Sequence, residues 1–326
     1  MIRRSVALLA VILLVACGGD APTIVGLPYS DYAHEDEPFA RELFSEHSSK
    51  IDIDDDPELF FVWGETDQRY THVTGGARLT PTSVPGAPVV WFMGGSTMFG
   101  IGQRDEHTIA SEVARIAADA GMPIDARNYG TSAYVGWQEA GLLRRLMARE
   151  DRPDLIVFLH GVNDFSQTCR HLAAGIDPMS RTNPLTDAPI DPDGPQEFNC
   201  WDDPSAGGAV VASVLDASMA EAASVADGVP IVEFWQATAY TRKPSPTDAE
   251  LLEHLDETRY DFDRSGAVYR AAISADAVPG VDLTDVFDDH EGPVFFDWAH
   301  TNELGARLLA EAMWERRLRD EVEQLG

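Results

Sequence analysis

From residue 89 onwards the chain alternates short apolar runs with longer amphipathic stretches. The apolar runs predict strands at residues 89–93, 124–128, 155–159, 231–234 and 281–283. Apolar residues at helical spacing predict helices near residues 104–120, 136–150, 209–226, 266–275 and 303–324. Five consecutive strand–helix units predict an α/β domain over residues 89–326, with a parallel sheet covered by helices on both faces.

The N-terminus has a different pattern. Residues 1–16 combine a basic start with an apolar run far shorter than the ~20 residues that span a bilayer, so they read as a signal peptide. The run ends in Leu14-Val15-Ala16-Cys17, which resembles the lipobox of bacterial lipoproteins. That resemblance implies cleavage before Cys17, lipidation of Cys17 and an extracytoplasmic protein anchored to a membrane. The alternative is an ordinary signal peptide with a chance cysteine.

Residues 17–88 carry weaker signals. Residues 17–50 are mostly polar and contain several prolines, which predicts a tether. Residues 51–88 hold two β-prone runs, at 60–63 and 70–73, which predict a small antiparallel annex beside the first main strand, followed by a linker. The acidic run at 51–56 lacks the glycine and the final glutamate of an EF-hand, so we expect a solvated loop there.

Composition narrows the choice of function. The 326 residues are 44% hydrophobic, enough for a core, and carry a formal net charge of −31, which opposes binding to nucleic acid. Two of the three cysteines, Cys169 and Cys200, lie in one long interruption after the third strand; in an exported protein they predict a disulfide. The histidines show no H-E-x-x-H pattern, so no metal and no cofactor are expected.

Small polar residues follow the predicted strands. The first strand runs into Met93-Gly94-Gly95-Ser96, which places a serine between a strand and a helix, at the edge where parallel sheets bind ligands. The segment departs from the G-x-S-x-G elbow at Met98, and a plain turn is the alternative. The two long interruptions, residues 165–208 and 236–264, leave from the same edge and are candidate walls of a site.

Three further segments complete a recognisable set. They are Asn128-Tyr129-Gly130, Gly161-Val162-Asn163-Asp164 and the pair Asp297 and His300. A serine, an unobstructed glycine amide, an asparagine amide and an Asp/His pair are the groups that acyl transfer needs. Their order over about residues 89–317 resembles the SGNH hydrolase superfamily, the GDSL-type esterases and lipases. The usual GDS of the first block is Gly94-Gly95-Ser96 here.

The resemblance implies a flavodoxin-like three-layer α/β/α sandwich with a five-stranded parallel sheet, preceded by the small β annex. It implies that Ser96 is the nucleophile, that His300 is the general base and that Asp297 orients the imidazole. It also implies an oxyanion hole made of the backbone N–H groups of Ser96 and Gly130 and the side-chain amide of Asn163. The expected activity is hydrolysis of a small-molecule or glycan carboxylic ester.

Alternatives remain at this point. Gly130 alone is typical of a turn and Asn163 of a helix cap, while His160 and His290 are rival bases that lack an aspartate at the family spacing. The same residues suit an O-acyltransferase that acts on carbohydrate hydroxyls. An inactive surface binding protein of the same fold is the third reading.

Overall fold

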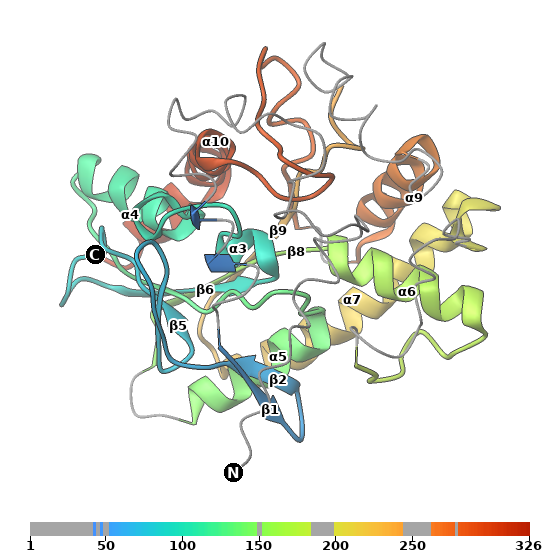
Figure 1. The fold of residues 1–326 in the computed structure, drawn as a ribbon, viewed down its shortest axis with the longest axis horizontal. Helices are drawn as coiled ribbons and strands as arrows, with labels where there is room; N and C mark the ends of the chain where they lie inside the picture. The colour runs from blue at the N-terminus through green and yellow to red at the C-terminus, as the bar shows by residue number, and fades with distance from the viewer. Residues whose placement is uncertain are drawn as a thin grey trace.

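The alternation of strands and helices forms one mixed sheet with helices on both sides (Figure 1). The computed structural model describes residues 42–43, 46–47, 52–148, 152–183, 199–243, 262–277 and 280–326. The parallel strands are β6 (Val89–Gly94), β7 (Asp125–Asn128), β8 (Leu155–His160), β9 (Ile231–Trp235) and β10 (Val281–Asp282). They lie in the order β10-β9-β8-β6-β7, so the predicted five-stranded parallel sheet is confirmed.

The two faces of the sheet have separate cores because successive strand residues point to opposite faces. The helices are α4 (Ile109–Asp119), α5 (Gly136–Met147), α6 (Val162–Ala174), α7 (Pro204–Ala226), α9 (Phe262–Ala275) and α10 (Glu303–Met313). Val90 and Phe92 of β6 pack in the core that includes residues of α4 and α10. Trp91 and Met93 pack in the core of α5, α7 and α9. The result is the three-layer α/β/α sandwich.

Some helices differ from their predicted limits. Helix α6 occupies the start of the stretch that the sequence predicted to be an irregular interruption. The expected helix 104–120 begins with the 3-10 turn η2 (Asp105–His107), and α4 starts only after Thr108, whose side chain accepts from the N–H of Ser111. The expected helix 303–324 is α10, then the π-helical segment η4 (Trp314–Leu318), then α11 (Arg319–Glu323).

The N-terminal strands correct two expectations. Strands β1 (Ile53–Asp56) and β2 (Phe60–Trp63) pair as a small separate sheet, so the acidic run is a strand and not a solvated loop. Strands β3 (Thr66–Asp67), β4 (His72–Thr74) and β5 (Ala77–Arg78) instead extend the main sheet. They join it through the antiparallel pair Arg78–Asn128, beside β7 and not beside the first main strand β6. These three strands therefore cover the edge of the sheet beyond β7, where backbone N–H and C=O groups would otherwise be unpaired.

The end of the expected tether also belongs to the folded domain. Leu43, Glu46 and His47 are almost fully buried. The carboxylate of Glu46 accepts from the backbone N–H groups of Arg69 and Tyr70, and Nδ1 of His47 accepts from the N–H of Gly102. These contacts fix residues that the sequence predicted to be a tether. Cys17 and the signal peptide lie outside the described residues.

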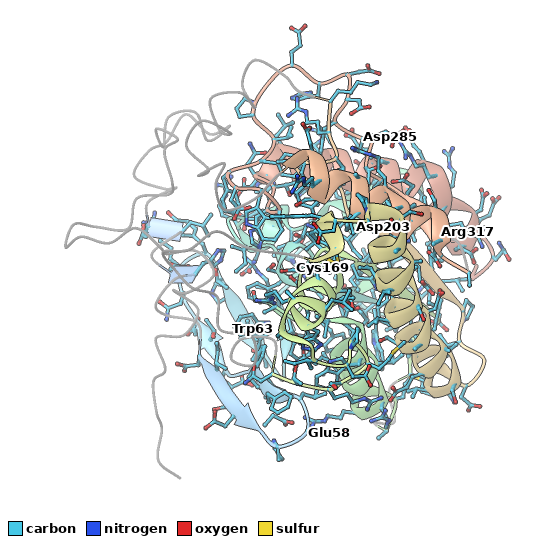
Figure 2. The ribbon with its side chains drawn as sticks, turned by 90° about the vertical axis from the view of Figure 1, so that its right-hand side faces the viewer. Glu58, Trp63, Cys169, Asp203, Asp285 and Arg317 are labelled. Carbon is cyan, nitrogen blue, oxygen red and sulfur yellow. A yellow bond between two sulfur atoms is a disulfide. The ribbon has the colours of Figure 1, made fainter. Side chains whose placement is uncertain are left out.

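The predicted disulfide is present. Cys169 of α6, labelled in Figure 2, is bonded to Cys200 in the 3-10 turn η3 (Asn199–Trp201), with 5.5 Å between the two Cα atoms. It ties α6 to the start of α7. Among the described residues, α7 is long and apolar enough to cross a membrane by length and composition, but it packs against α5, α6 and α9 as a core helix does.

Candidate active site

Ser96 lies at the carboxyl edge of the sheet, as the first residue of the short helix α3 (Ser96–Phe99). Strand β6 ends at Gly94, whose φ of +151° disfavours side chains and where a Cβ atom would approach the carbonyl oxygen of Leu159 to 2.3 Å. Glycine therefore allows the chain to leave β6 and turn directly into α3. The N-cap residue of α3 is Gly95, which has no side chain to cap the helix.

His300 faces this serine. Its Nε2 atom lies 2.6 Å from Ser96 Oγ, and its Nδ1 atom lies 2.6 Å from Asp297 Oδ2. The other carboxylate oxygen of Asp297 accepts from the backbone N–H groups of Ala299 and His300 at 2.8 and 2.7 Å. The ring of Phe296 stacks on the imidazole, with centroids 5.6 Å apart. The carboxylate of Asp297 thus holds the Nδ1 edge of the imidazole, and the Nε2 edge faces the hydroxyl of Ser96.

Asn163 lies against Gly95, the residue before Ser96. It is in the first turn of α6, after Gly161, where φ is +111° and a Cβ would meet Trp235 and Tyr269 at 2.6 Å. Its Nδ2 donates to the carbonyl of Tyr134 at 2.9 Å. A Cβ on Gly95 would lie only 2.5 Å from that Nδ2. The glycine that replaces the usual aspartate of the GDS block therefore leaves space for the Asn163 amide.

The backbone N–H of Gly130, which the sequence predicts to be an oxyanion donor, has a partner in its own loop. Its N–H donates to Asn128 Oδ1 at 3.0 Å, and its carbonyl accepts from Trp63 Nε1 at 3.0 Å. A Cβ at this position would come within 2.3 Å of the backbone nitrogen of Phe99. Gly130 therefore lets the loop after β7 approach α3, while its N–H is already engaged within its own loop.

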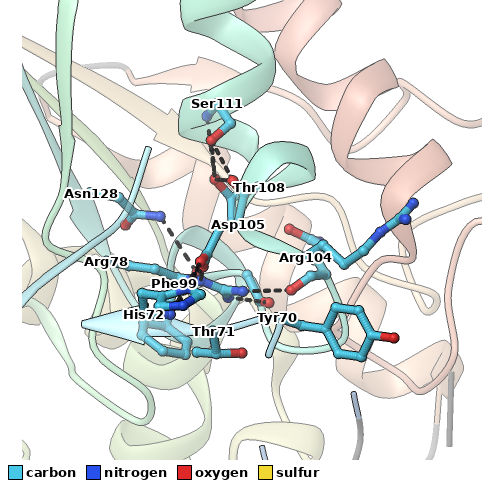
Figure 3. Close-up of polar contacts among 12 residues, drawn as sticks. Tyr70, Thr71, His72, Arg78, Phe99, Arg104, Asp105, Thr108, Ser111 and Asn128 are labelled. Carbon is cyan, nitrogen blue, oxygen red and sulfur yellow. Dashed lines mark hydrogen bonds and ion pairs between the residues drawn. The ribbon is translucent and has the colours of Figure 1, made fainter. Parts of the chain in front are cut away.

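An arginine that the sequence did not single out contacts the C-terminal end of α3 (Figure 3). Arg78 of β5 is buried, and its guanidinium donates to the carbonyls of Phe99, Gly100 and Gln103 at 2.5–2.8 Å. Its Nε donates to Asp105 Oδ1 at 2.8 Å. The last carbonyls of a helix lack hydrogen-bond donors within the helix, and at the end of α3 Arg78 is such a donor. The sequence signal was weak: one arginine ending a short β-prone segment.

A second histidine–carboxylate group lies behind the site. His160 Nδ1 is 3.3 Å from Glu139 Oε2, and both side chains are buried. Burial raises the pKa of Glu139 well above its usual value. Burial first, and the charge of Glu139 second, raise the pKa of Asp164 to about 6. One oxygen of Asp164 accepts from the N–H of Gly136 at 2.8 Å, so Asp164 anchors the start of α5.

The hydroxyl of Ser96 therefore bonds to His300, and not to the rival histidines His160 or His290. Among the residues that the structure describes, no three His, Cys, Asp or Glu side chains gather as a metal site. The set Ser96–His300–Asp297, with an amide at its side, has the groups and distances of a nucleophile activated by an oriented base.

A family profile matches most of the chain. Residues 92–308 match the profile of the GDSL-like lipase/acylhydrolase family. The chain belongs to this family, and by that membership it is an esterase-type hydrolytic enzyme. Its mixed α/β sandwich is the fold expected from the SGNH resemblance.

Similar solved structures are distant. A member of the lipolytic G-D-S-L family from Veillonella parvula is 14% identical, with a TM-score of 0.44, over 72% of this chain and 100% of that one. The corresponding values for TesA are 15%, 0.40, 73% and 99%. For a catalytic mutant of Axe2, an acetylxylan esterase from Geobacillus stearothermophilus, they are 15%, 0.38, 74% and 96%. No curated protein sequence matches the chain.

Proposed function

We propose that this chain is a serine esterase that hydrolyses a carboxylic ester through an acyl-enzyme on Ser96. One observation carries the proposal: Ser96 Oγ lies 2.6 Å from His300 Nε2, while Asp297 holds the opposite edge of the same imidazole. Ser96 lies about 200 positions before Asp297 and His300 in the chain, and the three residues meet at one edge of the sheet. No cofactor is required for the reaction.

In the acylation step, His300 Nε2 takes the proton of Ser96 Oγ as that oxygen attacks the ester carbonyl carbon. The new carbon–oxygen bond leaves a tetrahedral intermediate with a negative oxygen. His300 then passes its proton to the alcohol oxygen as the ester bond breaks. Asp297 keeps Nδ1 protonated, so that Nε2 is the nitrogen that accepts.

The negative oxygen needs donors that are in place before the reaction. We assign this role to the backbone N–H of Ser96 and the side-chain amide of Asn163. One hydrogen of Nδ2 is directed at the Tyr134 carbonyl, which fixes the amide and leaves the second hydrogen for the substrate. We do not assign a third donor to Gly130, because its N–H is directed at Asn128.

In the deacylation step, water attacks the acyl carbon while His300 accepts a proton from it. The second intermediate collapses, the carboxylic acid leaves and Ser96 regains its proton from His300. We expect a small-molecule or glycan ester as substrate. If a sugar hydroxyl replaced water in this step, the same residues would perform O-acyl transfer.

Covalent labelling by a fluorophosphonate tests the proposal. The wild type is expected to be labelled on Ser96, with parallel loss of ester hydrolysis, and Ser96→Ala is expected to be inert. Ser132→Ala is the control, because the Ser132 hydroxyl is buried and has no hydrogen-bond partner among the described residues. A wild type that is neither labelled nor hydrolytic would be a binding protein of this fold. Faster acyl transfer to added sugar alcohols than to water would identify an acyltransferase.

We also propose that Cys17 anchors the protein by lipid to a bacterial membrane, outside the cytoplasm. The lipobox-like sequence supports this, and the Cys169–Cys200 disulfide is in keeping with an oxidising compartment. Cys17→Ser is expected to move the protein from the membrane fraction to the soluble or uncleaved pool. A wild-type protein that stays in the membrane fraction with an uncleaved N-terminus would contradict lipid anchoring.

A further inference from the structure

Gln236 touches both segments that carry the proposed reacting groups. It follows β9, and only 3% of the residue is exposed. Its Nε2 donates to Thr97 Oγ1 at 2.7 Å and to the carbonyl of Ala299 at 2.9 Å. Thr97 follows Ser96 in the chain, and Ala299 precedes His300. One amide group therefore connects the neighbours of the two residues that must meet.

The orientation of this amide follows from chemistry. A backbone carbonyl only accepts hydrogen bonds, so the NH₂ of Gln236 must face Ala299. Thr97 Oγ1 accepts the second hydrogen and itself lies 3.4 Å from the carbonyl of Ala299. The three groups form a closed polar bridge in a buried place, where each bond is worth more than in water.

The backbone of Gln236 is fixed to the sheet. Its N–H donates to the carbonyl of His160 at 3.1 Å, and its carbonyl accepts from the hydroxyl of Tyr269 at 3.1 Å. Gln103 makes a similar bond to the residue after His300, with its Nε2 donating to the carbonyl of Thr301 at 2.9 Å. Gln236 therefore holds α3 and the 297–300 turn in a fixed position relative to the end of strand β9.

We propose that Gln236 is a positioning residue for the esterase reaction, which holds α3 and the 297–300 turn at the separation where Ser96 Oγ reaches His300 Nε2. The inference rests on the proposed function. Ser96 and His300 come from segments with no covalent link near the site, so small shifts of either lengthen the 2.6 Å contact. A misplacement of about 1 Å can cost on the order of 100-fold in rate.

Gln236→Met tests this, because methionine keeps the length and removes the donors. We expect kcat and the rate of Ser96 labelling by fluorophosphonate to fall about 10- to 100-fold, with KM nearly unchanged. Gln138→Met is the matched control: the Gln138 amide is also buried and donates to a carbonyl, that of Leu59 at 2.8 Å, but it touches neither segment. Both variants should lose similar thermal stability, while only Gln236→Met should lose turnover.

Different outcomes would overturn the inference about Gln236 and the proposed function. A Gln236→Met enzyme with kcat within twofold of the Gln138→Met enzyme overturns the inference. A wild type that is not labelled at Ser96 instead overturns the proposed function. If Gln236→Met does not fold, Thr97→Val removes the hydroxyl end of the bridge with little change of shape; a several-fold loss of kcat supports the inference, and an unchanged kcat overturns it.

Discussion

Two histidine–carboxylate pairs lie at the carboxyl edge of the sheet, and they differ in what the second ring nitrogen meets. His300 has a carboxylate at 2.6 Å on one side and the Ser96 hydroxyl at 2.6 Å on the other. His160 has Glu139 at 3.3 Å, while its Nε2 is buried without a hydrogen-bond partner among the described residues and lies 3.8 Å from Glu233. A paired carboxylate therefore does not by itself make a histidine a candidate base.

The carboxylates differ as well. Asp297 Oδ1 accepts two backbone N–H bonds, which fix the carboxylate that faces the imidazole. Glu139 is wholly buried, and burial raises its pKa and favours the neutral form. The first turn of α6 separates the two regions: Asn163 lies against Gly95, the residue before Ser96, whereas Asp164 lies with Glu139 and His160. Two neighbouring residues of one motif thus have different roles: Asn163 in the proposed reaction, and Asp164 in the packing of the fold.

The largest expected effect tests the two histidines directly. His300→Ala and Ser96→Ala should each lower kcat by about 10⁴- to 10⁶-fold, and the double variant should be little worse, because the members of one catalytic unit are not additive. His160→Gln, which keeps a polar partner for Glu139, should stay within a few-fold of wild type. Steady-state kinetics on a chromogenic ester checks this. An active His300→Ala enzyme would remove the difference drawn between the two regions.

The next effect concerns the amide beside Ser96. Asn163→Ala should lower kcat by about 10²- to 10³-fold, because it removes one oxyanion donor and leaves the Ser96 N–H. KM should change little, since the bond forms mainly in the transition state. Asp164→Asn is the neighbouring control and should keep most of kcat. Equal losses in the two variants would mean that the first turn of α6 acts only as a structural unit.

Asp164 gives a prediction on stability. A buried carboxyl whose pKa rises from 3.8 to about 6 binds a proton in the folded protein that the unfolded chain releases. Its contribution is therefore lost as pH rises from about 4 to about 6, and stays lost above that range. Asp164→Asn removes this pH dependence. The difference in free energy of unfolding between Asp164→Asn and wild type should therefore change by about 2 kcal/mol, in favour of the variant, from pH 4 to pH 7. Urea unfolding at both pH values measures it; a pH-independent difference would contradict the assignment.

The smallest effect sharpens the role of the GDS departure. Gly95→Ala places a Cβ about where the Asn163 amide lies, 2.5 Å from Nδ2, and a flexible side-chain end yields more readily than backbone. We expect about a tenfold loss of kcat, which is roughly 1.4 kcal/mol, with little change in thermal stability. In an Asn163→Ala background the same substitution should cost almost nothing. Additive losses would show that Gly95 acts independently of Asn163.

The sequence by itself determined the layers and the parts of the site. Hydrophobic periodicity along β6 and α4 is a local property, so it predicted the five parallel strands and most of the helices. The polar residues after each strand, Ser96 and Asn163 among them, could be expected at one edge because parallel strands all end there. The Cys169–Cys200 bond was predicted from the cysteine count and from an N-terminus that resembles a signal peptide.

Only the tertiary structure decided which of these groups meet. Ser96 and His300 are 204 residues apart, and Gln236 and Thr97 are 139 apart, so no periodicity relates them. The engagement of the Gly130 N–H by Asn128 is local in sequence, but it depends on how closely the loop packs on α3. The support of α3 by Arg78 likewise required β5 to pair with β7. Local patterns fix what each segment can form, whereas contacts between distant segments depend on the packing of all the layers together.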